Sequence, residues 1–206
     1  MGQERWREAV VEYIRGEAQP VDKFGHQPRL YGLAVEIAGD PEVAGACDEE
    51  VLFAAAWMHD LGVFVGHRPA DPAELAGWDH VPYTIARSRE LLAGWGFPVG
   101  KLEAVADVIR THQPQDEPRT LESVVLRDAD MLEQLGAVGA LRAFTKVGRD
   151  TRYHRWTEVV PVLERALERL PGLLRLERSR RLAEGRVECL RGILEGLRQE
   201  AGDWLC

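Results

Sequence analysis

The chain has 206 residues, of which 45% are hydrophobic and 29% are charged, a composition typical of one globular domain with a substantial core. Lysine and arginine number 26 against 34 aspartate and glutamate residues, so the formal net charge is −8. This negative charge argues against a general binder of nucleic acid or anionic membranes, because polyphosphate surfaces attract clustered cations. It does not exclude a small phosphate ester held through a metal ion.

Three other classes of protein are also disfavoured. No stretch approaches the roughly 18–20 uncharged apolar residues of a membrane span. The first ten residues are acidic and basic with no apolar core, so we expect no signal peptide. Cys47, Cys189 and Cys206 are odd in number, far apart and form no CxxC pair. We therefore expect neither a disulfide framework nor a cysteine-rich zinc site, and the expected location is the reducing cytoplasm.

Apolar spacing is helical along the first third of the chain, with no strand-like alternation. Residues 4–15 carry an apolar stripe, and the segment from Asp22 to Ile37 carries another. Asp48 is a predicted helix N-cap, followed by two glutamates that suit the first turn. The helix that it opens is apolar nearly all round until Gly62 can end it, which is typical of a helix in the middle of a bundle.

Helical patterns then continue after one long loop. Residues 66–77, rich in glycine and proline, form the longest predicted loop. Further helices are predicted at about 79–94 and 100–112, and Thr120 caps another that runs to Leu135.

The composition changes after Lys146. Residues 157–204 place leucines at helical spacing among alternating arginine and glutamate, which is typical of two packing helices with solvated faces. We predict an all-α fold, with one domain over residues 1–150 and C-terminal helices over residues 151–206 packed on the same domain.

Histidines and aspartates occur where buried polar groups need partners. His59 and Asp60 end the most hydrophobic helix, and a carboxylate there must be paired, hydrogen-bonded or bound to a metal. His26 begins the preceding helix. Asp130 and its neighbour Asp128 interrupt an apolar segment, a local conflict that tends to mark functional sites. The alternative is that His59 is a core histidine and Asp60 a surface residue.

The set His26, His59, Asp60 and Asp130 combines two imidazoles with two carboxylates. Such nitrogen and oxygen ligands suit Mn, Fe, Co, Ni or Zn better than Ca, and Mg stays a further candidate. On a metal that prefers six ligands, four protein ligands leave room for water and substrate.

The order H…HD…D on separate helices resembles that of the HD-domain metal-dependent phosphohydrolases, over about residues 20–145. The resemblance is strongest in Ala-Ala-Ala-Trp-Met-His59-Asp60-Leu-Gly and in the stretch from Asp128 to Arg142. The second stretch is similar to the DADxLxxLGAxGxxR pattern of small stand-alone bacterial HD hydrolases. By that match the fourth ligand is Asp130 rather than Asp128. The resemblance implies an HD-domain helical bundle with additional C-terminal helices.

The resemblance also implies roles for residues outside the four ligands. His80 and His112 fall where dinuclear members complete a second metal site and where mononuclear members approach the substrate phosphate. Arg29, Arg142 and Lys146 are candidate phosphate contacts, with an ordinary surface ion pair as the alternative for each.

The predicted activity is hydrolysis of a phosphate ester or anhydride of a small phosphorylated molecule, with nucleotides as the first candidates. A divalent ion would lower the pKa of its bound water and polarise a phosphoryl oxygen. Asp60 and His59 are the predicted catalytic residues, and Asp60 could orient or deprotonate the attacking water. We expect no nucleic-acid or membrane partner, whereas the C-terminal helices could pair between chains in a homo-oligomer.

Two alternatives stay open. Some relatives of this fold carry a di-iron site and act as oxygenases, and the presence of both His80 and His112 is compatible with that chemistry. A non-catalytic signalling or interaction module is the other alternative, although such relatives typically lose ligands. His67 and His154 are expected to lie outside the site.

Overall fold

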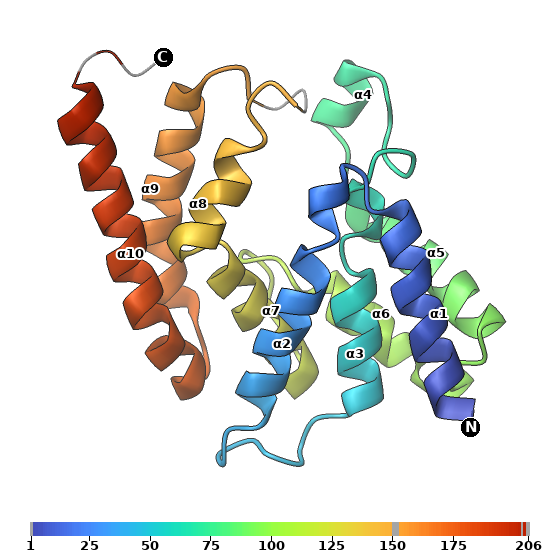
Figure 1. The fold of residues 1–206 in the computed structure, drawn as a ribbon. Helices are drawn as coiled ribbons and strands as arrows, with labels where there is room; N and C mark the ends of the chain where they lie inside the picture. The colour runs from blue at the N-terminus through green and yellow to red at the C-terminus, as the bar shows by residue number, and fades with distance from the viewer. Residues whose placement is uncertain (1, 150–152, 203, 205–206) are drawn as a thin grey trace. The chain divides into compact units, whose positions relative to one another are not determined.

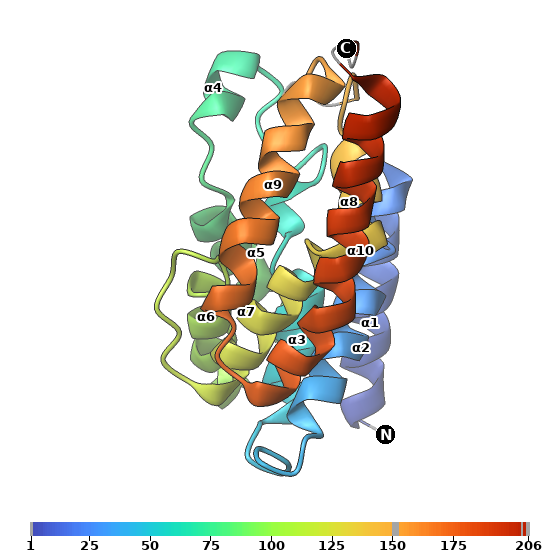
Figure 2. The same cartoon turned by 90° about the vertical axis from the view of Figure 1, so that its left-hand side faces the viewer.

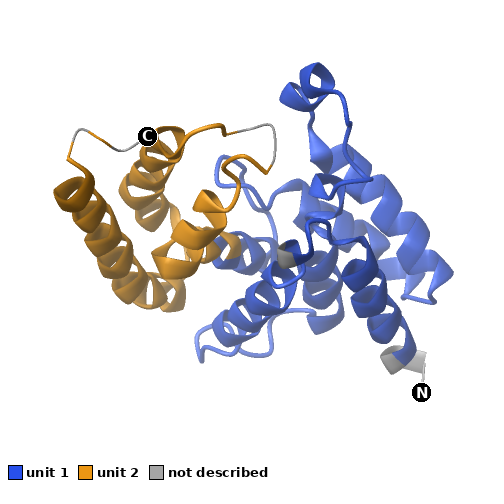
Figure 3. Cartoon of the chain, turned by 45° about the horizontal axis from the view of Figure 1, so that its top comes forward, with its two compact units in different colours: residues 1–129 blue, residues 130–206 orange. Residues whose placement is uncertain are grey.

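The computed structural model describes residues 2–149, 153–202 and 204, and within them every regular element is a helix, which confirms the predicted all-α fold (Figure 1). The chain forms two compact units, residues 1–129 and 130–206 (Figure 3). Their boundary falls inside one helix, before the change of composition that follows Lys146. None of the described helices is both long and apolar enough to cross a membrane.

The first unit contains the predicted bundle. Its helices in chain order are α1 (Gly2–Glu17), η1 (Val21–Lys23), α2 (His26–Ala38), α3 (Glu49–Met58), η2 (Leu61–Val63), α4 (Pro72–Ala76), α5 (His80–Gly94), η3 (Val99–Lys101), α6 (Leu102–Arg110) and most of α7 (Leu121–Glu133).

Helix α3 is the centre of this unit. Its residues from Val51 to Met58 are all buried, as its apolar sequence predicts, and α1, α2 and α6 pack against it. The three consecutive alanines Ala54, Ala55 and Ala56 are fully buried, and small side chains let neighbouring helices approach closely.

The predicted N-cap of α3 is confirmed. The Asp48 carboxylate accepts hydrogen bonds from the backbone N–H groups of Glu50 and Val51, at 3.1 and 3.3 Å. The helix ends at Met58 rather than at Gly62, because the chain turns at His59 and Asp60 into the short helix η2.

The predicted loop over residues 66–77 contains the short helix α4. Asp71 caps it by accepting from the backbone N–H groups of Ala73 and Glu74, and Pro72 takes the first helical position. None of the residues of α4 is buried, and its sequence needs no apolar stripe. Because that stripe is the signal by which helices are recognised, the sequence predicts a loop here.

The second unit contains the end of α7 and the helices α8 (Gly136–Phe144), α9 (Trp156–Leu173) and α10 (Glu177–Ala201). Helix α10 packs against α8 and α9, and Figure 2 shows α9 and α10 side by side. Their contact buries leucines at helical spacing, among them Leu163, Leu170, Leu190 and Leu194. The two predicted C-terminal helices are therefore present. Cys206, one of the three cysteines, lies outside the described residues.

Candidate metal centre

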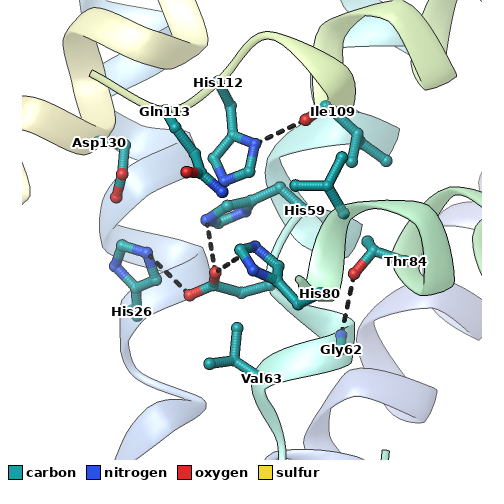
Figure 4. A network of polar contacts seen from close by, with 12 residues as sticks. His26, His59, Gly62, Val63, His80, Thr84, Ile109, His112, Gln113 and Asp130 are labelled. Atoms are coloured by element: carbon teal, nitrogen blue, oxygen red, sulfur yellow. Dashed lines mark hydrogen bonds and ion pairs between the residues drawn. The ribbon is translucent and has the colours of Figure 1, made fainter. Parts of the chain in front are cut away.

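Two turns of the first unit bring His26, His59 and Asp60 together (Figure 4). His26 is the first residue of α2, and the other two residues form the turn between α3 and η2. The Asp60 Oδ2 atom lies 3.7 Å from His26 Nε2, and its Oδ1 atom lies 3.6 Å from His59 Nε2. These three residues are called the first histidine group below.

Asp60 also belongs to a second group, with His80 and His112. His80 is the first residue of α5, and its Nε2 atom lies 4.0 Å from Asp60 Oδ1. His112 follows the end of α6, and its ring centroid lies 5.1 Å from that of His59 and 5.6 Å from that of His80. These three residues are called the second histidine group. The two histidines that the sequence placed near the site thus lie beside Asp60.

Backbone carbonyl groups orient two of the imidazoles. His59 Nδ1 lies 3.0 Å from the carbonyl oxygen of Ala56, and His112 Nδ1 lies 2.6 Å from that of Ile109. Because a carbonyl oxygen only accepts, each Nδ1 must carry the proton, and in the neutral ring the lone pair is then on Nε2. This is the arrangement by which a second interaction fixes the tautomer of a metal-binding histidine.

Asp60 is ionised in these surroundings. Burial alone would raise the pKa of its carboxyl group, but the four neighbouring imidazoles, His59 foremost, outweigh burial and hold that pKa well below its usual range. A carboxylate oxygen beside imidazole nitrogens is a donor set suited to a cation.

The family is decided by comparison with known proteins. The model of the HD domain matches residues 24–135, more than half of the chain. The chain belongs to the HD domain family. The matched segment contains every residue of both histidine groups, so the cluster is part of the HD domain itself.

Several solved structures share the fold. YpgQ of Bacillus subtilis, in complex with ADP, is 22% identical with a TM-score of 0.69, over 97% of each chain. A predicted HD superfamily hydrolase from an uncultured Thermotogales bacterium is 23% identical with a TM-score of 0.59, over 96% of this chain and 92% of that one. An HD-superfamily hydrolase from Bacillus thuringiensis is 19% identical with a TM-score of 0.66, over 97% and 98%. The comparison with curated proteins found no match.

The donor atoms of the HD domain fit a divalent cation. Each histidine group offers two imidazole nitrogens and one carboxylate oxygen within 4.8 Å of one another. Two ligands at about 2.1 Å from one tetrahedral or octahedral ion are about 3.0–3.4 Å apart, slightly closer than the 3.6–4.0 Å between the nitrogens and oxygens here. Small side-chain rotations would close that difference.

The predicted fourth ligand, Asp130, lies on the last turn of α7 in the second unit. Its carboxylate is half-buried, and its Oδ2 atom accepts a hydrogen bond of 3.2 Å from the side-chain amide of Gln134. Asp128 is completely buried. Ligation by Asp130 stays a prediction from the motif.

The three candidate phosphate contacts have different surroundings. Arg29 is exposed on α2. Arg142 is paired with the buried Glu133: its Nη1 atom lies 3.6 Å from the carboxylate and donates to the carbonyl oxygen of the same residue at 3.3 Å. Lys146 is half-buried in the turn after α8. The Arg142 pair supports the ion-pair alternative for that residue.

His67 and His154 take part in other contacts. His67 Nε2 lies 2.8 Å from the Glu17 carboxylate, and its Nδ1 lies 2.8 Å from the Tyr83 hydroxyl. His154 is exposed, and its backbone N–H donates to Glu158 at 2.7 Å.

Two contacts beside the cluster were not predicted from the sequence. Lys23 Nζ donates to the carbonyl oxygen of Val63 at 3.0 Å, which joins the segment before His26 to the turn after Asp60. Thr84 accepts from the backbone N–H of Gly62 (Figure 4). The only sequence signal for either contact is the position of Lys23, three residues before His26. The partners of Lys23 and Thr84 are backbone groups of distant residues, which no sequence pattern identifies.

Proposed function

We propose that this HD domain is a metal-dependent phosphohydrolase that cleaves a phosphate ester or anhydride of a small molecule. The observation that carries the proposal is the position of the ionised Asp60 carboxylate between the two histidine groups. His26, His59 and Asp60 would hold the ion, with Asp130 as the fourth ligand by the motif. The bound divalent ion supplies an activated water and a positive charge for the phosphoryl oxygen.

The protein groups have distinct tasks in this proposal. The Asp60 carboxylate, which lies between the two histidine groups, would orient the attacking water by accepting a hydrogen bond or take its proton. His59, held through Nδ1 by the Ala56 carbonyl, presents Nε2 in a fixed direction. His80 and His112 would either complete a second cation site with Asp60 or contact the phosphate.

A nucleotide is the proposed substrate. YpgQ, which shares the fold, was crystallised with ADP. This chain has a net charge of −8, which would repel the negative phosphates of a nucleotide, and a bound cation would offset that repulsion. Arg29 and Lys146 would contact the phosphate. Arg142 would do so only if its ion pair with Glu133 breaks. Neither nucleic acid nor a membrane is proposed as a partner. A homo-oligomer through the C-terminal helices and a cytoplasmic location complete the proposal.

The test is phosphate or pyrophosphate release from a panel of nucleotides and phosphomonoesters. The protein is first stripped with a chelator and then assayed separately with Mn, Mg, Co, Ni and Zn. We expect release with at least one cation and none in the stripped protein. Asp60→Asn, which keeps the size of the side chain, should be inactive, whereas His67→Gln should retain activity. Equal release by parent and Asp60→Asn would contradict the proposal.

A di-iron oxygenase is the second candidate, and the shared Asp60 carboxylate between two histidine pairs favours it. Two irons retained through purification, together with oxygen consumption and no phosphate release, would support this candidate and refute the hydrolase.

A further inference from the structure

Gly62, the middle residue of η2, lies against the start of α5 at His80 and Thr84. A Cβ atom on Gly62 would lie 2.9 Å from the carbonyl oxygen of His80 and 3.0 Å from its Cβ atom. It would also lie 2.9 Å from the Thr84 hydroxyl. Glycine is therefore required here by space, and a side chain would push η2 away from the first turn of α5.

Hydrogen bonds hold both sides of the Gly62 residue. Its N–H donates to the Thr84 hydroxyl at 3.0 Å, and its carbonyl oxygen accepts from the Trp78 indole N–H at 2.9 Å. Thr84 is fully buried, so removal of its oxygen would leave a buried N–H without that acceptor. These contacts among Gly62, Thr84 and Trp78 are called the Gly62 clamp below.

The Gly62 clamp joins the two backbone segments that carry Asp60 and His80. Asp60 precedes Gly62 by two residues, and His80 precedes Thr84 by one turn of α5. The first turn of α5 is itself fixed by Asp79, which accepts from the backbone N–H of Val81 at 3.0 Å. The distance of 4.0 Å between His80 Nε2 and Asp60 Oδ1 is thus set by contacts behind both side chains.

We propose that Thr84 and Trp78 are positioning residues that, through Gly62, hold the His80 imidazole beside the Asp60 carboxylate. The inference rests on the proposed cation site, and it assigns to this site two residues that touch neither cation nor substrate. Loss of such outer contacts typically weakens metal binding by about 10–100-fold.

The test is a double-mutant cycle read by calorimetric titration of the metal-stripped protein with Mn²⁺. Thr84→Val keeps the shape and removes the acceptor, whereas Thr84→Ser keeps the hydroxyl and is the matched control. We expect Thr84→Val to weaken Mn²⁺ binding by about tenfold or more and Thr84→Ser to stay near the parent. In a His80→Ala background, Thr84→Val should change the affinity by less than about twofold, because its effect passes through the missing imidazole.

Trp78→Phe is a second, independent test, because it removes the other hydrogen bond to Gly62 and leaves the buried Thr84 unchanged. It should weaken Mn²⁺ binding in the parent and not in the His80→Ala background. The inference is overturned if neither change weakens binding, or if both weaken it equally with and without His80. A parent protein that binds none of Mn²⁺, Mg²⁺, Co²⁺, Ni²⁺ and Zn²⁺ would refute the proposed function, and this inference with it.

Discussion

Asp128 and Asp130 show how two carboxylates on one helix, two residues apart, come to have different surroundings. Asp128 is completely buried, whereas Asp130 is half-buried and accepts from Gln134. The sequence predicts a conflict at both positions, and only the family motif selects Asp130 as the ligand. Burial of Asp128 indicates a structural role, because a carboxylate inside a protein must be hydrogen-bonded or paired.

We expect Asp130→Asn to abolish Mn²⁺ binding and turnover with little change in folding. Asp128→Asn should keep Mn²⁺ binding but lower the free energy of unfolding by about 1–3 kcal/mol, because a buried hydrogen-bonding group is altered. Calorimetric titration and urea denaturation measure the two effects. The reverse pattern, with the cation lost in Asp128→Asn alone, would transfer the fourth ligand to Asp128.

The cysteines offer a prediction about pH. Burial, with a smaller contribution from the Glu122 charge, raises the pKa of the Cys47 thiol to about 11. At pH 8 only about one Cys47 in a thousand is then a thiolate, the reactive form. Cys189 is exposed on α10.

We therefore expect iodoacetamide at pH 8 to modify Cys189 well before Cys47, and Cys47 to react faster as the pH approaches 11. Mass spectrometry of tryptic peptides follows each cysteine separately, Cys206 included. Rapid modification of Cys47 at pH 8 in folded protein would show that its thiol is not protected.

At the scale of single elements, the sequence predicts helices where an apolar stripe or a cap is present. Asp48 and the apolar run after it specify the start of α3, whereas its end depends on the turn at His59 and Asp60, which no local pattern marks. Helix α4 buries no residue and was therefore predicted as loop. The sequence predicts which residues belong to the histidine groups, but the distances between their side chains depend on how α2, α3 and α5 pack.

The cap of α3 can be tested by substitution. Asp48 also pairs with Lys101, at 2.5 Å. We expect Asp48→Ala to lower the free energy of unfolding by about 1–2 kcal/mol, because α3 loses its cap. Asp48→Asn should lose less, since asparagine caps helices nearly as well, and the remaining loss reports on Lys101. Denaturant unfolding at neutral pH measures both.

The same residue gives a dependence on pH. Burial would raise the pKa of Asp48, but its hydrogen bond from Lys101 and its backbone partners together lower that pKa. The stabilisation is then complete above the unfolded pKa of about 3.9 and is lost as the pH falls through the lower folded value. The difference between parent and Asp48→Asn should therefore shrink below about pH 4. A difference that is unchanged at pH 2 would contradict this account.

At the scale of the whole molecule, the fold class was predictable and the division into units was not. The change to alternating arginine and glutamate after residue 146 describes the exposed faces of the last helices, and the leucines among them describe the buried faces. The boundary between residues 129 and 130 depends on which helices contact one another, and it divides α7. A break in composition therefore marks a change of surface, and it need not coincide with a change of packing partners.

Cation binding should stabilise the whole protein measurably. A ligand that binds only the folded chain adds about 2.7 kcal/mol at a concentration of 100 times its Kd. We expect Mn²⁺ to raise the Tm of metal-stripped protein in a concentration-dependent manner, and a chelator to reverse the shift. Differential scanning calorimetry measures the effect. Asp60→Asn is the control and should show no shift, so an equal rise in this variant would indicate binding elsewhere.

The segment between η2 and α5 is held by contacts at both of its ends, and most of the residues between these contacts are exposed. The carbonyl oxygen of Gln19 accepts from the backbone N–H of Val65, and His67 contacts Glu17, while Trp78 closes the far end on Gly62. Residues 69–77 lie between these contacts, and this segment can change in length with little loss of stability of the bundle. In protein engineering, this is where a peptide tag or reporter would be accommodated; in evolution, it is where HD proteins could diverge without rebuilding the cluster.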